Sequence, residues 1–505
     1  MKFTFSGIFV FITLICFSQT EVPNNWFHLD PPGLSTQKLY GEFLKTKPTK
    51  KIIVAVLDSG VDYLHEDLKN KMWVNKDEIS NNGIDDDKNG YIDDIHGWNF
   101  LGNSKGENII HDNLEVTRVY GDLKTKYEGK TKSDLKKKQL EEFDLFLQTK
   151  SEVEAKQNEL NEQQQFYQLI AASIAELKSE LGLEDITVKD LESFETENPM
   201  LKNISTMLMS ILGQGMTFKD VEKDLNDGLE QFSSQSKYFY NPEWNPRTIL
   251  SGDKIYGNQN VKGPDSRHGT HVAGIIAAER NNSIGMDGVA DYVEIMSVRT
   301  VPDGDERDED VAKAIRYAAD NGAHIINMSF GKGYSPDKKI VDKAIKYATK
   351  KGVLLIHAAG NDGKENDSFN NFPNTRAAKK LKNDPKLSKN WIEVGALNFE
   401  LGENLPASFS NYSKNWVDVF APGVRIYSTT PDNSYENLQG TSMAAPMVAG
   451  VAALIWSHFP DFKAYQIKEI ILKSSIKSEE LKNISVTGGM VNALEAYKLA
   501  SVIRF

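Results

Sequence analysis

Residues 51–60 read KIIVAVLDSG, an apolar run that ends in aspartate, serine and glycine. Because its apolar residues do not alternate with polar ones, the run indicates a strand that is buried on both faces. Strands of this kind occur in parallel sheets that helices cover on both sides. Open α/β sheets bind ligands at the carboxyl ends of their strands, so Asp58 at the end of the run is a candidate functional residue.

The same kind of run recurs along the rest of the chain. Four further strand-like runs lie at Val293–Val298, Ile325–Met328, Val353–His357 and Ile392–Val394. Stretches with helical spacing of apolar residues accompany them at Val311–Ala319 and Lys339–Lys350. This alternation predicts an α/β fold with a doubly wound, mostly parallel sheet and helices on both faces.

Residues 115–237 interrupt this alternation with a different composition. Lys, Glu, Gln and Leu are abundant there, whereas Pro and Gly are sparse. Apolar residues recur at helical spacing, as at Leu135, Leu140, Phe143, Leu147, Phe166, Ile170, Ile174, Leu177 and Leu181. We expect two or more amphipathic helices whose apolar residues pack in a core, inserted into one domain made of residues 21–114 and 238–505. A lid, an exosite and a dimerisation arm are the alternatives for the role of this insertion.

The first residues are typical of a secretory signal. Lys2 is followed by an apolar run from Gly7 to Phe17, which is too short to span a bilayer. We expect a signal peptide over residues 1–20 and a protein that is secreted or located in the periplasm or cell envelope, without a stable membrane span. The alternative is a lipid anchor on Cys16, although Ile15 stands where such signals carry a small residue.

Composition limits the remaining classes of function. The 505 residues are 40% apolar, which is enough for at least one large core. The net charge of −12 disfavours nucleic acid as a partner, because phosphate binding relies on clustered Lys and Arg. Cys16 is the only cysteine, so the mature protein has no disulfide and depends on its core or on metal for stability. The oligomeric state is left open.

Two helix-opening motifs carry the chemistry. Residues 440–446 read GTSMAAP and open a helix of small and apolar residues that we expect to end near Trp456, with Pro446 in its first turn. A serine at a helix N-terminus is commonly an N-cap, but its own backbone N–H can also face a developing oxyanion. Residues 268–274 read HGTHVAG and open a second buried helix, in which we expect His271 to have a structural role.

One carboxylate, one imidazole and one hydroxyl can be combined into a catalytic triad. A serine hydroxyl is a weak nucleophile at neutral pH, and it needs an imidazole base that a carboxylate orients. Asp58, His268 and Ser442 provide one group of each kind in the chain order Asp, His, Ser. Two rival classes are a calcium-dependent binding protein on an inactive scaffold and a metal-dependent hydrolase. The hydrolase would need histidine ligands, which the acidic run at residues 85–94 lacks.

Three motifs together resemble those of the subtilase family of serine proteases. They are DSGVD at residues 58–62, HGTHVAG at residues 268–274 and GTSMAAP at residues 440–446. The resemblance implies a subtilisin-like fold and a secreted serine endopeptidase that hydrolyses polypeptide substrates through an acyl-enzyme, with Asp58, His268 and Ser442 as triad. It covers about residues 25–112 and 241–505 and fails over the helical segment between them.

The resemblance extends to two further motifs around the site. Residues 358–361 read AAGN, which implies that Asn361 donates to the oxyanion together with the Ser442 backbone N–H. Residues 327–331 read NMSFG, which implies that Ser329, Phe330 and Gly331 bind the substrate backbone and form one wall of the S1 pocket. Two departures are Met447, where many members have histidine, and a stretch before residue 51 that is short for a folding propeptide.

Residues 85–94 read DDDKNGYIDD, a run of oxygen-bearing side chains with a glycine at its sixth position. This spacing suits a structural Ca²⁺ ion, a hard cation that binds carboxylate, amide and carbonyl oxygens, and five aspartates would repel one another without a counter-ion. An acidic surface turn is the alternative reading. The expected ligands are Asp85, Asp87, Asn89, the Tyr91 carbonyl, and Asp93 or Asp94.

A second calcium site follows from the resemblance alone. Residues 281–285 read NNSIG, which is similar to the loop that wraps a calcium ion in subtilisin. The resemblance implies Asp67 and Asn282 as side-chain ligands and Ile284 and Met286 as carbonyl ligands.

Overall fold

The computed structural model describes residues 22–44, 47–252, 256–366, 370–376 and 384–505. The predicted signal peptide at residues 1–20, including Cys16, lies outside the described residues. Within the described ranges, no helix combines the length and the apolar character that crossing a membrane requires.

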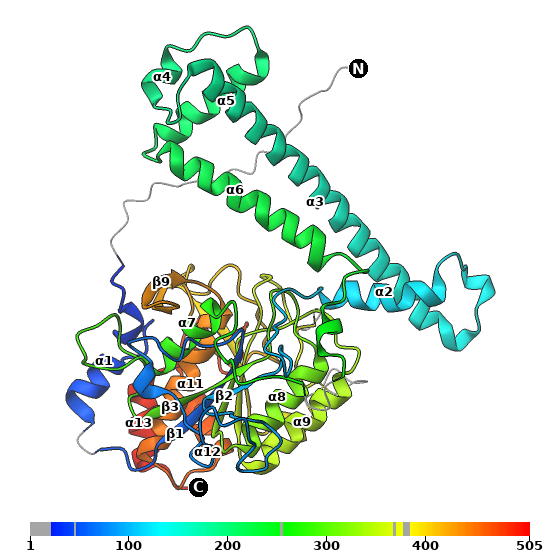
Figure 1. Cartoon of the computed structure of the whole chain (residues 1–505). Helices are drawn as coiled ribbons and strands as arrows, with labels where there is room; N and C mark the ends of the chain where they lie inside the picture. The colour runs from blue at the N-terminus through cyan, green and yellow to red at the C-terminus, as the bar shows by residue number, and fades with distance from the viewer. Residues whose placement is uncertain (1–21, 45–46, 253–255, 367–369, 377–383) are drawn as a thin grey trace.

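A nine-stranded sheet forms the centre of the molecule (Figure 1). Its strands, in spatial order, are β10 (Ile476–Lys477), β11 (Gly489–Met490), β7 (Val419–Pro422), β6 (Trp391–Leu397), β5 (Leu354–Ala358), β4 (Ile325–Met328), β1 (Ile52–Asp58), β3 (Val293–Arg299) and β2 (Gly97–Asn99). All neighbours are parallel except β10 and β11. β8 (Ile426–Thr430) and β9 (Ser434–Leu438) form a separate antiparallel pair. The predicted mostly parallel sheet is confirmed.

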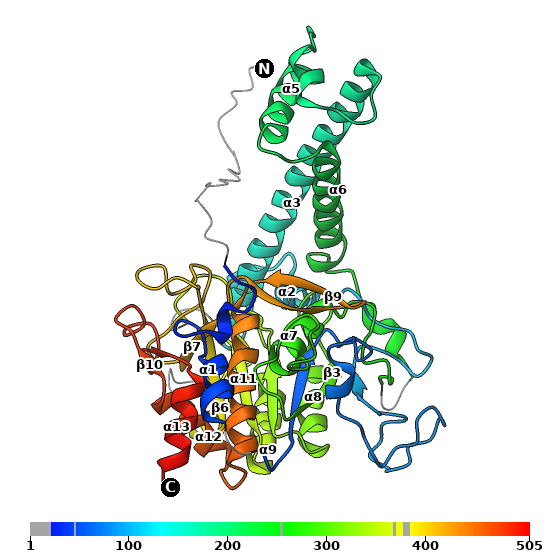
Figure 2. The same cartoon turned by 90° about the vertical axis from the view of Figure 1, so that its left-hand side faces the viewer.

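Helices cover both faces of this sheet (Figure 2). One face carries α7 (Arg267–Ala277), α11 (Thr441–His458), α12 (Ala464–Lys473) and α13 (Ala493–Val502), and the other carries α8 (Asp308–Asp320) and α9 (Lys338–Lys351). Successive residues of β1 enter the two cores in turn, since Val54 packs in the first and Ala55 in the second. Burial on both faces is why the run at residues 52–57 has no polar alternation.

The predicted helical insertion is confirmed as a long arm that projects from the α/β body (Figures 1 and 2). Its helices are α2 (Glu115–Tyr127), α3 (Leu140–Leu181), α4 (Val188–Glu192), α5 (Pro199–Leu212) and α6 (Phe218–Ser234). With 42 residues, α3 alone measures about 63 Å at 1.5 Å per residue. The chain returns beside its departure point, because the Leu114 N–H donates to the Phe239 carbonyl at 3.1 Å.

The arm has one apolar core at each end. Residues of α2 and the start of α3, such as Tyr127 and Phe143, form the core at its base, and α3, α5 and α6 form a second core at its tip. The expectation that every apolar residue of the segment packs in a core was wrong for Leu147 and Phe166, which are 43% and 58% exposed. A helix packed against few partners buries one stripe only and leaves its opposite face solvated.

Both views place the arm above the end of the body where β9 lies. β9 ends at Leu438 and α11 begins at Thr441, so the arm rises on the same side as the N-terminus of α11. A lid, an exosite and a dimerisation arm all stay predictions for its role.

Candidate active site

Three elements bring Asp58, His268 and Ser442 to one side of the sheet. Asp58 is the last residue of β1, which lies between β3 and β4. The strand order reverses at β1, and such a switch point is where doubly wound sheets bind ligands. His268 and Ser442 are the second residues of α7 and α11.

The Asp58 carboxylate holds the His268 ring. Asp58 Oδ1 lies 2.7 Å from His268 Nδ1 and also accepts the Ser59 N–H at 2.8 Å. Asp58 is buried, whereas 39% of the His268 side chain is exposed. Desolvation of the ring works to lower the pKa of His268, but the Asp58 charge and hydrogen bond outweigh it and raise this pKa above its ordinary value. The ring is therefore oriented by Asp58 and open on its outer side.

Ser442 is joined to the segment that follows β4. Its Oγ donates to the Ser329 carbonyl at 3.0 Å, and Ser329 Oγ donates back to the Ser442 carbonyl at 2.8 Å. No hydrogen bond joins Ser442 Oγ to the His268 ring among the described residues. Catalytic hydrogen bonds are often loose before substrate binds and tighten in the complex, so this arrangement is compatible with a nucleophile and its base.

Pro446 lies deeper in its helix than predicted. Because α11 begins at Thr441, Pro446 is its sixth residue, and the expectation that it occupies the first turn was wrong. A proline there leaves the carbonyl four residues earlier, that of Ser442, without its helical donor. Ser329 Oγ supplies the missing hydrogen bond. The proline thus frees the Ser442 carbonyl, which accepts a hydrogen bond from the segment that follows β4.

Asn361 is fixed at the N-terminus of α11. Its Oδ1 accepts the Thr441 N–H at 2.8 Å and the Thr441 hydroxyl at 2.9 Å. In the described part of the chain, no group accepts a hydrogen bond from Asn361 Nδ2, so this amide is a free donor beside the first N–H groups of the helix. Gly440 precedes the helix with a φ of 150°, a conformation essentially confined to glycine. Asn361 Nδ2 and the N–H groups at the start of α11 are donors of the kind that bind an oxyanion.

The segment of Ser329, Phe330 and Gly331 directly follows β4 and lies against Ser442. The Phe330 side chain is only 9% exposed and packs in the second core, with its ring edge-to-face with His357. Phe330 therefore offers its backbone rather than its ring to a ligand. A Cβ on Gly331 would lie 2.2 Å from Asn371 Oδ1, so any larger residue there would displace the Asn371 side chain.

His271, three residues beyond His268, is fully buried. Its Nε2 lies 2.9 Å from the Ile426 carbonyl and 3.2 Å from the Glu436 carbonyl. Burial, with a contribution from His268, lowers the pKa of His271 to about 3. A neutral ring held by two carbonyls has the structural role expected for it.

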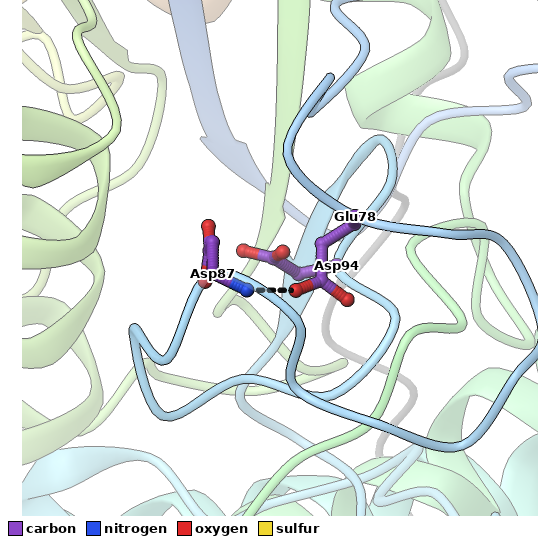
Figure 3. A group of neighbouring side chains, drawn as sticks. All are labelled: Glu78, Asp87 and Asp94. Carbon is purple, nitrogen blue, oxygen red and sulfur yellow. Dashed lines mark hydrogen bonds between the residues drawn. The ribbon is translucent and has the colours of Figure 1, made fainter.

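The acidic loop gathers three carboxylates (Figure 3). Asp87 and Asp94 meet Glu78, and each of the three offers an oxygen within 4.8 Å of the others. Burial raises the pKa of Asp94 to about 6. Glu78 was missed because it precedes the aspartate run and no local spacing marks it; its side chain accepts the backbone N–H groups of Asp86, Asp87 and Asp93.

The other predicted ligands of this loop point partly elsewhere. Asp85 accepts the N–H groups of Asn89 and Gly90, and Asp93 accepts those of Asn82 and Gly83. Asn89 Nδ2 donates to Asp87 and Asp94. The structure thus groups Asp87, Asn89 and Asp94 and places Asp85 and Asp93 in turns of the same loop.

The second predicted calcium loop also comes together. The Asp67 carboxylate accepts from Asn282 Nδ2 at 2.7 Å and from the Met286 N–H at 3.3 Å. Burial raises the pKa of Asp67. Ile284, predicted to contribute its carbonyl, is 41% exposed.

Comparison with known proteins identifies the family. The model of the Subtilase family matches residues 49–492, so the chain belongs to this family. A thermophilic serine proteinase of Bacillus sp. (strain AK1) is 44% identical over 193 residues, which are 38% of this chain and 43% of that protein. Subtilisin BL of Lederbergia lenta is 38% identical over 227 residues, which are 45% of this chain and 76% of that protein.

Two more similarities involve a longer relative and a solved structure. The cell wall-associated protease of Bacillus subtilis (strain 168) is 35% identical over 252 residues, 50% of this chain and 25% of that protein. A protease structure from Pseudoalteromonas arctica PAMC 21717 is 29% identical, with a TM-score of 0.42, and the match covers 50% of this chain and 80% of that one. The chain thus spans less than half the length of some curated relatives.

Proposed function

We propose that this protein is a secreted serine endopeptidase that cleaves polypeptides through an acyl-enzyme. The observation that carries the proposal is the 2.7 Å contact of Asp58 with His268, on the side of the sheet where Ser442 opens α11. The subtilase family match and the serine proteinases among the relatives support it. The apolar start of the chain and the cell wall-associated relative support export.

Each residue has one step in the proposed reaction. Ser442 Oγ attacks the scissile carbonyl while His268 takes its proton and later gives it to the leaving amine. Asp58 holds the ring with a proton on Nδ1, which leaves Nε2 as the base. Asn361 Nδ2 and the Ser442 N–H stabilise the tetrahedral oxyanion. Residues 329–331 bind the substrate backbone as an added strand.

A covalent probe tests this proposal. A serine-directed fluorophosphonate is expected to label the purified protein once, on the peptide that contains Ser442. Prior denaturation is expected to abolish labelling, because the hydroxyl is activated only beside His268. Labelling of another residue, or labelling that survives denaturation, would contradict the triad.

We also propose that the acidic loop binds a structural calcium ion. Oxygen ligands lie about 2.4 Å from calcium, so two oxygens that share one ion are at most about 4.8 Å apart. The oxygens of Glu78, Asp87 and Asp94 lie within 4.8 Å of one another and meet this condition. Three grouped carboxylates repel one another, and a cation removes that repulsion. Asp67 and Asn282 form the second candidate site.

Calcium is expected to raise the thermal midpoint by several degrees. A ligand at 100 times its Kd that binds only the folded state adds about 2.7 kcal/mol of stability. The Glu78→Gln, Asp87→Asn double variant is expected to lose most of this increase in thermal midpoint. The measurement is scanning calorimetry at increasing concentrations of CaCl₂. Asp86→Asn, a control in the same loop but outside the three-acid group, is expected to keep it. An equal response of the double variant and the wild type would exclude this loop as the site.

A further inference from the structure

A buried lysine directly follows the proposed substrate-binding segment. The Lys332 side chain is 1% exposed, and its Nζ lies 2.6 Å from Glu115 Oε2 and 2.9 Å from Asp308 Oδ1. It also donates to the Glu306 carbonyl at 2.7 Å. Removing a buried charge from its partners is strongly destabilising, so these contacts fix the side chain firmly.

Glu115 connects this lysine to the arm. It is the first residue of α2, and its carboxylate also accepts from Arg118 Nη2 at 2.7 Å. Burial works to raise the pKa of Glu115, but Arg118 and Lys332 outweigh it and hold this pKa below its usual value. Arg118 in turn donates to the Asp305 carbonyl. The root of the arm is thus bound to the segment that leads into α8.

Opposite charges are paired in this buried cluster. Lys332 and Arg118 are cations, and Glu115 and Asp308 are their anionic partners. Burial raises the pKa of Glu306 to about 8 and thus favours its neutral carboxyl. Moving Lys332 or Glu115 would leave a buried charge without its partner, which is strongly destabilising.

The backbone around Lys332 connects the buried cluster to the segment that binds Ser442. Lys332 pairs with Phe372 through two backbone hydrogen bonds of 3.1 and 2.9 Å. Three residues earlier, Ser329 exchanges hydrogen bonds with Ser442. Residues 329–331 are therefore held at one end by the nucleophile's helix and at the other by the buried cluster.

We propose that Lys332 is a positioning residue for the substrate-binding segment 329–331, and that the arm, through Glu115, helps to set the geometry of this segment. This inference rests on the proposed function, and it makes the root of the arm part of the substrate-binding side of the enzyme. The KM for an extended substrate that pairs with residues 329–331 depends on the position of these residues. The rate at which a small probe labels Ser442 does not.

Lys332→Met tests the inference with two readouts. The KM for an extended peptide is expected to rise by up to about 100-fold, because a displacement of roughly 1 Å can cost this factor in catalytic efficiency. The rate of fluorophosphonate labelling of Ser442 is expected to stay unchanged, and Lys332→Arg is expected to restore part of the loss in KM. Lys313→Met is the matched control, since Lys313 pairs with Glu309 at the exposed surface of α8 and is expected to leave both readouts unchanged.

A second variant keeps the test decisive if Lys332→Met does not fold. Glu115→Gln removes the negative charge of Glu115 but leaves Lys332 paired with Asp308. It is expected to raise KM by a smaller factor than Lys332→Met. Unchanged KM in the folded variants would overturn the inference. A rate of Ser442 labelling that falls while KM rises would also overturn it, because the effect would then be on the whole site. Absence of Ser442 labelling in the wild type would instead contradict the proposed function.

Discussion

Replacing Ser442 with alanine is expected to lower kcat for peptide hydrolysis by about a million-fold, the magnitude known from subtilisin, a relative of this chain. The variant lacks the nucleophile, and neither His268 nor Asn361 can form an acyl-enzyme in its place. The measurement is release of peptides from casein and of the leaving group from a small peptide substrate.

The fold is expected to survive this substitution. Ser442→Ala removes one hydrogen bond to the Ser329 carbonyl, which contributes about 1 kcal/mol at most sites. A thermal midpoint within a few degrees of the wild type checks this point. Ser501→Ala, on the exposed side of α13, is the matched control and is expected to keep full activity. Hydrolysis by Ser442→Ala at the wild-type rate would exclude Ser442 as the nucleophile.

Replacing Asp58 with asparagine is expected to lower kcat by about 10⁴-fold at neutral pH. Asp58 Oδ1 accepts from His268 Nδ1, so the ring carries its proton there and keeps Nε2 free as a base. An amide N–H in place of that oxygen favours the opposite tautomer, in which Nε2 is already protonated. Steady-state kinetics on a peptide substrate measure the loss.

The pH profile distinguishes this role from a purely structural one. The base must be neutral, so activity falls as the pH drops below the pKa of His268, which Asp58 raises above the ordinary value of about 6.5. The acidic limb of kcat/KM in the wild type is therefore expected above pH 6.5. In Asp58→Asn the residual activity is expected to have its acidic limb at lower pH. A limb that stays in place in the variant would show that Asp58 does not set the protonation of His268.

The sequence was informative wherever burial or function leaves a local pattern. Residues 52–57 are apolar without alternation because β1 contacts a core on each face, and such runs in alternation with helical stretches predicted the parallel sheet. The helical spacing within residues 115–237 likewise predicted the insertion. Asp58, His268 and Ser442 could be selected because each ends a strand or opens a helix, positions that local sequence marks.

Only the tertiary structure decided which distant groups meet. Glu78 joins Asp87 and Asp94 although it lies outside the aspartate run. Ser329 Oγ binds the carbonyl that Pro446 leaves free, a pairing of residues 113 positions apart. Lys332 binds Glu115 across 217 positions.

Contacts between residues that are far apart in the sequence leave no periodic pattern and no fixed spacing in the chain. They depend on how the sheet, the arm and the loops pack, and a buried charge such as that of Lys332 can be assigned a partner only once its surroundings are known. Local sequence thus determined the elements and the candidate triad, and tertiary packing decided the ion pairs and hydrogen bonds that position them.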